Sequence, residues 1–215
     1  MGFDNLGTHS WPKIHSMTLA RGTERIESER LTLRRIGPDD LEFLTELHAD
    51  PEVARYLPLG RPRSPEESAA WLQSLLRSYE DFALGQLAVL RKSDGMLIGR
   101  CGLSGLAVEA RAGAAAVPRG WYQRGEVPAD AEIVLERELG YTFHRSSWGQ
   151  GYASEAARCV FDYARDGLRL PRVVSLIHPD NVRSLRVAQR FGVQREDVVE
   201  VQSRLYDRFA WPMGA

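Results

Sequence analysis

A short glycine-containing run has the composition of an anion-binding turn. It extends from Trp148 to Ala153, with Gly149 and Gly151 inside it, between a strand-like and a helix-like segment. The first backbone amides of a helix have no partner within the helix and can converge on an anion. Glycines let a phosphate approach the backbone, and the helix dipole adds about 0.3 to 1 kcal/mol per charge. The run therefore predicts a pyrophosphate-binding site.

Two common phosphate-binding motifs do not fit this run. A Rossmann site requires a third glycine where Ser154 stands, and an acidic residue about 20 residues later, where the sequence reads Leu168 to Leu170. A P-loop requires Gly-Lys-Ser/Thr, but Tyr152 follows Gly151. Dinucleotide and nucleoside-triphosphate chemistry are therefore disfavoured. A glycine-rich turn without a ligand remains the structural alternative.

Hydrophobic periodicity predicts the elements that position this run. Small residues such as Ala156 and Ala157 on the inner face of the following helix favour a close approach to a sheet. The expected elements of the second half are a strand over Ile133–Phe143, a helix over Gln150–Asp166, a strand over Val173–Ile177, a helix over Asn181–Phe191 and strands over Val193–Val201 and Leu205–Trp211.

The first half has its own start signals. Ser64-Pro65-Glu66-Glu67 is a capping box with proline at the first helical position, and it predicts a helix with an apolar stripe from Trp71 to Tyr79. The other expected elements are a strand over Leu31–Ile36, a helix from Pro38 to Asp50 and two strands, Gly85–Val89 and Met96–Leu103, joined by a turn at Ser93-Asp94-Gly95.

The 215 residues favour a single domain that spans residues 26–215. Residues 1–25 have no sustained periodicity and are interpreted as an N-terminal extension. Residues 107–130, rich in Ala, Gly and Pro, are interpreted as an elaborated connection between strands. This connection is a candidate lip over the acceptor site or contact in a homodimer, with an irregular surface loop as the alternative.

Composition bears on partners and location. The formal net charge of −1 lacks the positive excess that dominates nucleic-acid binding. No segment reaches the roughly 18 apolar residues of a membrane span, and no signal peptide is recognised, so a cytoplasmic protein without membrane contact is expected. The histidines are isolated from one another, and Cys101 and Cys159 form no CxxC motif, so no metal site is expected.

Two sequence blocks resemble the GNAT superfamily, in the variety carried by ribosomal-protein N-terminal acetyltransferases. Leu139 to Phe143 followed by Trp148 to Ala156 is similar to its acetyl-CoA motif. The pattern Q/R-x-x-G-x-G/A falls on Trp148, Gly151 and Ala153, and Trp at the first position is usual in this branch. Asn181 to Gly192 resembles its N-x-x-S helix, which ends in glycine. The resemblance extends over about residues 26 to 213, without 107–130.

The resemblance implies a mixed α/β (α+β) GNAT fold, with a twisted, mostly antiparallel sheet of about six to seven strands and about four helices. It implies direct transfer of acetyl from acetyl-CoA to a primary amine, on a protein N-terminus or a small molecule. The strand ending at Phe143 would part from the strand Val173–Ile177 to admit the pantetheine arm. The implied cofactor-binding residues are Tyr141, Thr142, Phe143, Arg145, Trp148, Gly149, Gln150, Gly151, Tyr152, Ala153, Ser154, Asn181, Ser184 and Arg190.

The expected catalytic groups are Phe143, Glu138 and Ser184. The backbone N–H of Phe143 would polarise the acetyl carbonyl. Glu138 adjoins the cofactor strand and is the candidate general base, directly or through water, with an exposed glutamate or a salt-bridge partner as the alternative. Many family members carry a Tyr general acid where this chain has Ala188, so Ser184 is the expected substitute near the sulfur, against a purely structural serine.

The acceptor chemistry is only partly constrained by the sequence. An α-amino group with a pKa near 7.8 is roughly one-tenth neutral at pH 7, whereas lysine is almost wholly charged, so an α-amine needs less help from a base. The acceptor side is expected near Arg55–Pro58 and Trp71, although core packing is the alternative for Trp71. Because the usual Tyr is missing, a catalytically weak acyl-CoA sensor remains the competing function.

Overall fold

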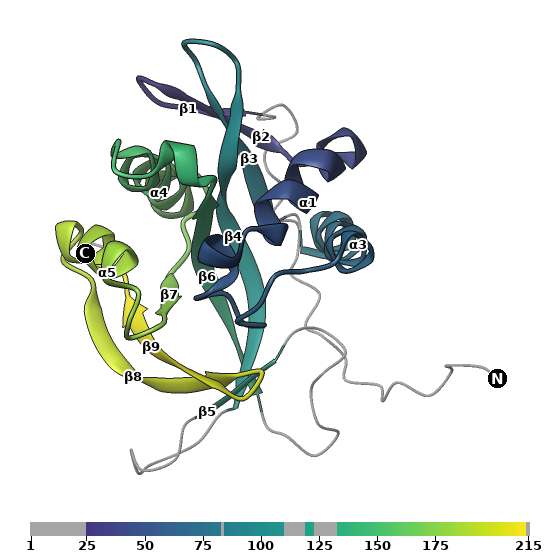
Figure 1. Cartoon of the computed structure of the whole chain (residues 1–215). Helices are drawn as coiled ribbons and strands as arrows, with labels where there is room; N and C mark the ends of the chain where they lie inside the picture. Colours follow the sequence, from purple (N-terminus) through teal and green to yellow (C-terminus); the bar gives the residue numbers. More distant parts are fainter. Residues whose placement is uncertain (1–24, 83, 110–118, 123–132, 214–215) are drawn as a thin grey trace.

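A nine-stranded sheet organises the residues that the computed structural model describes, which are 25–82, 84–109, 119–122 and 133–213 (Figure 1). All neighbouring strands are antiparallel except two parallel pairs, β5 with β8 and β6 with β7. The strands are β1 Arg25–Glu27, β2 Leu31–Arg35, β3 Gln86–Arg91, β4 Leu97–Glu109, β5 Arg119–Tyr122, β6 Ile133–Phe143, β7 Val174–Ile177, β8 Gln194–Val201 and β9 Arg204–Ala210.

Helices cover both faces of this sheet: α1 and α3 lie on one side and α4 on the other (Figure 1). The α-helices are α1 Leu41–Ala49, α2 Pro51–Ala54, α3 Pro65–Phe82, α4 Tyr152–Asp162 and α5 Val182–Arg190. The additional helical turns are Pro38–Asp40, Arg145–Ser147 and Tyr163–Gly167. This arrangement confirms the expected mixed α/β class. None of the described helices has the length and apolar content that crossing a membrane would require.

Successive side chains of a strand point to opposite faces of the sheet, so the apolar core is divided between the two faces. Leu87 and Val89 of β3 pack in the cluster that includes α4, whereas Ala88 packs with α1 and α3. Small residues in α4, among them Ala156 and Ala157, are fully buried and let the helix lie close to the strands. The sequence predicted this close approach correctly.

The sheet has two more strands than expected, β1 at Arg25–Glu27 and β5 within the segment 107–130. β4 continues through Ala107 to Glu109, and β5 pairs antiparallel with β4 and parallel with β8. The rest of this connection, and residues 1–24, lie outside the described residues, so a lip, a dimer contact and an N-terminal extension remain predictions. The single domain over residues 26–215 also remains a prediction.

The long strands β4 and β6 form a closed circuit with β7, β9, β8 and β5. A second apolar cluster fills this circuit, and Tyr206 of β9 belongs to it. The circuit holds β9 and β7 beside β6, and it thereby fixes one wall of the cavity described below. The members of the cluster are Leu106, Val108, Val174, Val199, Val201 and Tyr206.

The predicted capping box at Ser64 begins α3. The Ser64 N–H donates to Glu67 Oε2 at 2.9 Å, and the Glu67 N–H donates to Ser64 Oγ at 3.2 Å. We expect Ser64→Ala to lower the free energy of unfolding by about 0.5–2 kcal/mol, because it leaves a helix donor without this partner. Urea unfolding measures the change. Gln73→Ala, on the exposed side of α3, is the control and should change stability by less than about 0.5 kcal/mol; equal stability of both variants would contradict a stabilising cap.

Candidate active site

β6 and β7 are registered at Glu138 and Val174 and then part. Ser175 Oγ donates to the Leu139 carbonyl at 2.6 Å, so the Leu139 carbonyl faces β7. Just after the end of β6, the His144 N–H donates to the carbonyl of Ile98 at 2.9 Å. Ile98 belongs to β4, which lies on the other side of β6 from β7. Because backbone groups alternate between the two edges of a strand, the N–H of Phe143 faces away from β4 into the opening. This geometry matches the expected separation of the two strands.

The glycine run forms the entry to α4. Gly149 and Gly151 have φ of +76° and +83°, a left-handed conformation that favours glycine. Among the described residues, no group accepts a hydrogen bond from the backbone amides of Gly149 through Ser154. A Cβ added to Gly149 would meet no atom within 4 Å, so the turn borders open space. These amides therefore fit a bound anion such as a pyrophosphate.

The turn is held by contacts with the end of β6 and with α5. Trp148 Nε1 donates to the Phe143 carbonyl at 2.8 Å and so ties the turn to the end of β6. The Arg183 guanidinium of α5 lies 4.4 Å from the ring centroid of Trp148. Arg190, near the end of α5, donates to Ser154 Oγ at 2.8 Å. The structure thus brings Arg190 to the first turn of α4, as a contact with a CoA phosphate would require.

The other predicted residues near the turn have structural contacts. Gln150 Nε2 donates to the Ser146 carbonyl at 2.8 Å and closes the turn. Tyr152 is buried in the core, and the partly buried Ala153 packs against the same core cluster. The Arg145 side chain is exposed, with its Nε 3.7 Å from Asp50 Oδ2. Arg145 is not among the residues that line the cavity, and its role in cofactor binding therefore stays a prediction.

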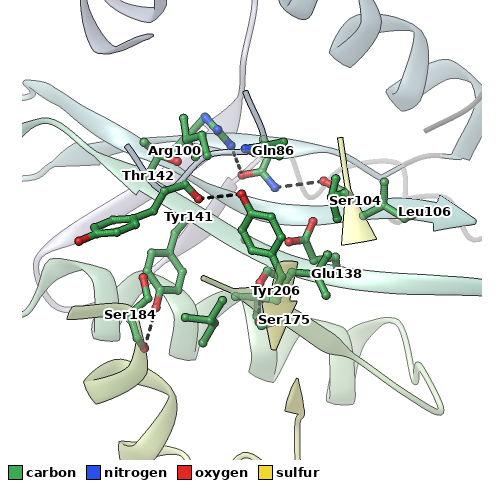
Figure 2. Close-up of a pocket in the computed structure, with 18 of the residues that line it drawn as sticks. Gln86, Arg100, Ser104, Leu106, Glu138, Tyr141, Thr142, Ser175, Ser184 and Tyr206 are labelled. Atoms are coloured by element: carbon green, nitrogen blue, oxygen red, sulfur yellow. Dashed lines mark hydrogen bonds between the residues drawn. The ribbon is translucent and has the colours of Figure 1, made fainter. Parts of the chain in front are cut away.

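A cavity of about 570 Å³ opens where β6 and β7 part. Every residue from Glu138 to Thr142 lines it, and since consecutive side chains point to opposite faces, the cavity reaches both faces of the sheet. Figure 2 shows Gln86, Arg100 and Ser104 joined by hydrogen bonds on one side of it, with Ser184 on another. The cavity can therefore bring a ligand from the α4 side to one on the α3 side.

Glu138 lies on the cavity wall where the strands part, directly opposite Ser104 across the β4–β6 pair. Burial raises the pKa of Glu138 to about 7, although Arg100 and a hydrogen bond from the backbone of Leu176 favour the charged form. Glu138 is the one carboxylate among the described residues that line the cavity. A carboxyl group with this pKa can accept a proton at neutral pH.

Asn181 and Ser184 reach the cavity from the start of α5. Asn181 Oδ1 accepts a hydrogen bond from the Ser184 N–H at 3.2 Å, so Asn181 caps this helix. The Tyr141 hydroxyl donates to the Ser184 carbonyl at 3.5 Å, and burial raises the pKa of Tyr141, which keeps it protonated. Ala188 lines the cavity one helical turn after Ser184. The Tyr141 hydroxyl from β6 thus lies beside the helix that lacks the usual tyrosine.

The structure divides the predicted residues between two neighbouring places. Tyr141, Thr142, Glu138, Asn181 and Ser184 line the cavity, whereas the glycine turn lies outside its lining. The expected acceptor-side residues Tyr56, Leu57, Pro58 and Trp71 also line it, and Arg55 does not.

Sequence reasoning missed several polar residues of the cavity: Gln86, Arg100, Ser104, Ser175 and Tyr206. One signal was present, because Arg100 and Ser104 are polar positions of one alternating face within an otherwise apolar strand. The partners of this face in β6 could not be assigned from the sequence.

Comparisons with known proteins agree with this geometry. A family model described as an acetyltransferase (GNAT) domain matches residues 30–194. The chain is 25% identical over 198 residues to N-acetyltransferase p20 of Bacillus licheniformis, covering 88% of this chain and 96% of that protein. It is 26% identical over 175 residues to the FsC-acetyl coenzyme A-N(2)-transacetylase of Aspergillus fumigatus, covering 78% of this chain and 64% of that protein.

Solved structures share the fold. An acetyltransferase from Agrobacterium tumefaciens superposes with a TM-score of 0.63 at 26% identity, covering 86% of this chain and 92% of that chain. RimL, a ribosomal L7/L12 alpha-N-protein acetyltransferase, superposes with a TM-score of 0.61 at 18% identity, covering 87% of this chain and 93% of that chain. The RimL comparison supports the architecture and leaves the acceptor open.

Proposed function

The chain belongs to the GNAT acetyltransferase family, and from that premise we propose that it transfers acetyl from acetyl-CoA directly to a primary amine. The observation that carries the proposal is the opening between β6 and β7, with unpartnered amides at the glycine turn and Glu138 inside the cavity. This transfer needs a site for the CoA phosphates and a proton acceptor. The glycine turn and Glu138 are the proposed groups for these two roles.

On the donor side, the backbone amides of Gly149 to Ser154 bind the pyrophosphate oxygens, and Arg190 neutralises a further phosphate. Acetyl-CoA supplies the acetyl group as an activated thioester. The pantetheine arm follows the open edge of β6, near Tyr141, Thr142 and Asn181. The Phe143 N–H, which faces the same opening, donates a hydrogen bond to the carbonyl oxygen as charge develops there.

On the acceptor side, Glu138 removes a proton from the amine, directly or through a water molecule. An amine attacks only in its neutral form, and a base with a pKa near the working pH is the most effective. The acceptor is an α-amine of a protein N-terminus or the amine of a small molecule. The proposed location is the cytoplasm, where acetyl-CoA and amine acceptors are both present.

Ser184 donates a hydrogen bond to the departing sulfur. Because a thiol with a pKa near 8.5 leaves without full protonation, this help is useful but dispensable. We therefore expect Ser184→Ala to lower kcat by less than about 10²-fold, the lower bound typical of general acid–base catalysis. Steady-state kinetics measure the change, and Ser93→Ala, at an exposed serine outside the cavity lining, is the control that should retain wild-type activity. A larger loss would contradict this minor role.

Thermal unfolding with and without acetyl-CoA tests the proposal. A ligand that binds only the folded state at 100 times its Kd stabilises it by about 2.7 kcal/mol, which raises Tm by roughly 5–10 °C for a chain of this size. NAD⁺ serves as the control ligand. No shift with acetyl-CoA, or the same shift with NAD⁺, would count against the assignment.

A further inference from the structure

The cavity holds an excess of positive charge. Arg63, Arg77 and Arg100 line it, whereas Glu138 is its one described carboxylate. Since half of the Glu138 population is protonated near its pKa of about 7, Glu138 offsets only part of this charge. Buried arginines in proteins are normally paired with a carboxylate or a phosphate, because an isolated buried charge is costly. The cavity therefore presents a positive charge that suits an anionic group.

Arg100 shows this excess of charge most clearly. One of its guanidinium nitrogens donates to Gln86 Oε1 at 3.1 Å, and its Cζ lies 4.8 Å from the ring centroid of Trp71. Its Nε is buried without a hydrogen-bond partner among the described residues. Burial, and then repulsion from Arg63, lower the pKa of Arg100 to about 10, so it remains charged at neutral pH. Gln86 and Trp71 thus hold a charged, incompletely bonded guanidinium at the cavity wall.

Near Arg63, the carboxylate of Glu67 forms its ion pair with Arg61. Glu67 also favours the charged form of Arg63, but burial outweighs this effect and lowers the pKa of Arg63. His48 cannot ionise here, because burial and both arginines lower its pKa to about 3. The phosphates of acetyl-CoA are assigned to the glycine turn, which lies outside the cavity lining, and the pantetheine arm is uncharged. An anionic group on the acceptor would therefore meet these arginines without competition from the donor.

We propose that the acceptor is an amino acid, whose carboxylate binds Arg100 and Arg63 while its amine faces Glu138. This assignment rests on the proposed acetyl transfer and names its substrate class. A guanidinium binds a carboxylate through charge-assisted hydrogen bonds from its planar donors. Arg100 and Glu138 lie on the same face of the β4–β6 pair, because Arg100 is opposite Thr142 and Ser104 is opposite Glu138. Their positions are four residues apart along the pair, and their side chains interact electrostatically across the cavity wall. In the proposed complex the amino acid lies between the two side-chain ends.

The same charges disfavour other amines. A polyamine would bring further positive charge to Arg63 and Arg100 and would be repelled. A peptide N-terminus with an acidic side chain could present a carboxylate, but it must also fit beside the pantetheine arm in a cavity of about 570 Å³. A free amino acid meets both constraints.

The test compares each amino acid of a standard panel with its own carboxamide, which removes the negative charge. Because this change also lowers the pKa of the amine, the two are compared at equal concentrations of neutral amine. CoA thiol release gives kcat/KM for each member of a pair. We expect wild type to prefer the acid by about 10- to 150-fold, the range for one charge-assisted hydrogen bond, and Arg100→Gln to abolish that preference. Arg63→Gln should reduce it, and Arg100→Lys should restore part of it. Arg195→Gln, at an exposed arginine outside the cavity lining, is the matched control and should keep it.

The outcomes separate this inference from the proposed function. Equal rates for acids and carboxamides, or a preference that survives in both Arg100→Gln and Arg63→Gln, would overturn the amino-acid assignment while acetyl transfer stands. Faster acetylation of spermidine or of an acidic peptide amide would overturn it in the same way. If no amine leads to thiol release, the proposed function fails, and thermal unfolding with an amino acid then tests the binding site by itself. A rise in Tm that is absent in Arg100→Gln would support amino-acid binding at Arg100. No rise in the wild type would contradict it.

Discussion

Replacing Glu138 by Gln is expected to lower kcat by about 10²- to 10⁴-fold, the usual contribution of a positioned general base. The amide retains the size of the side chain and an acceptor for the hydrogen bond from Leu176, but it cannot take a proton at neutral pH. Steady-state kinetics with a reactive amine measure the loss. Glu42→Gln, on the exposed side of α1, is the matched control and should retain wild-type activity.

The pH dependence gives this prediction a second readout. Because the folded-state pKa of Glu138 is raised from 4.5 to about 7, wild-type kcat/KM should fall as pH decreases through about 7, where the base becomes protonated. The same shift makes the folded state bind more protons than the unfolded state, so this group lowers stability as pH rises from about 4.5 to 7. The part of each dependence that Glu138 contributes should disappear in Glu138→Gln, and the remaining pH dependence of kcat/KM should follow protonation of the amine substrate. A variant with the wild-type rate and pH profile would show that the proton leaves by another route.

Gly149→Trp is expected to weaken acetyl-CoA binding by about 10²- to 10⁴-fold, equivalent to the loss of two charge-assisted hydrogen bonds. The indole would occupy the open space in front of the unpartnered amides, where a Cβ meets no atom within 4 Å. Isothermal titration calorimetry measures Kd for acetyl-CoA and for CoA.

Gly95→Trp provides a closely matched control for this change. Gly95 lies in the β3–β4 hairpin with φ +70°, against +76° at Gly149, and its Cβ would also meet no atom within 4 Å. Both substitutions therefore carry the same backbone strain and similar space, and they differ in their distance from the amide cluster. We expect Gly95→Trp to bind acetyl-CoA as the wild type does. Equal weakening in both variants would trace the effect to strain and would remove the turn from the binding site.

Local signals in the sequence predicted the parts of the site that a short segment determines. The conformation at Gly149 and Gly151 follows from residue type, and the cap of α3 follows from Ser64 and Glu67. The order of strands and helices from β6 to β9 also agrees with the hydrophobic pattern, with ends shifted by a residue or two. These features depend on neighbours within one or two turns of chain.

The acceptor side of the cavity depends on contacts that no short segment contains. Arg100 and Glu138 share a face because β4 and β6 pair in one particular register across the connection 107–130. The alternating pattern of each strand fixes which side chains share its own face, but it gives no register between strands. The raised pKa of Glu138 likewise requires burial by elements that are distant in sequence. The short strand β5 was missed because Ala, Gly and Pro surround it.

The most direct test of the central claim is the fate of an isotopically labelled acetyl group, followed by mass spectrometry of the amine, the free CoA and the intact chain. Direct transfer predicts that acetylated amine and free CoA appear in equal amounts, that the chain carries no acetyl label, and that both products are strongly reduced in Glu138→Gln. Saturable binding of acetyl-CoA without acetylated amine, across amino acids, peptides and other amines, would contradict the account and indicate an acyl-CoA-binding module.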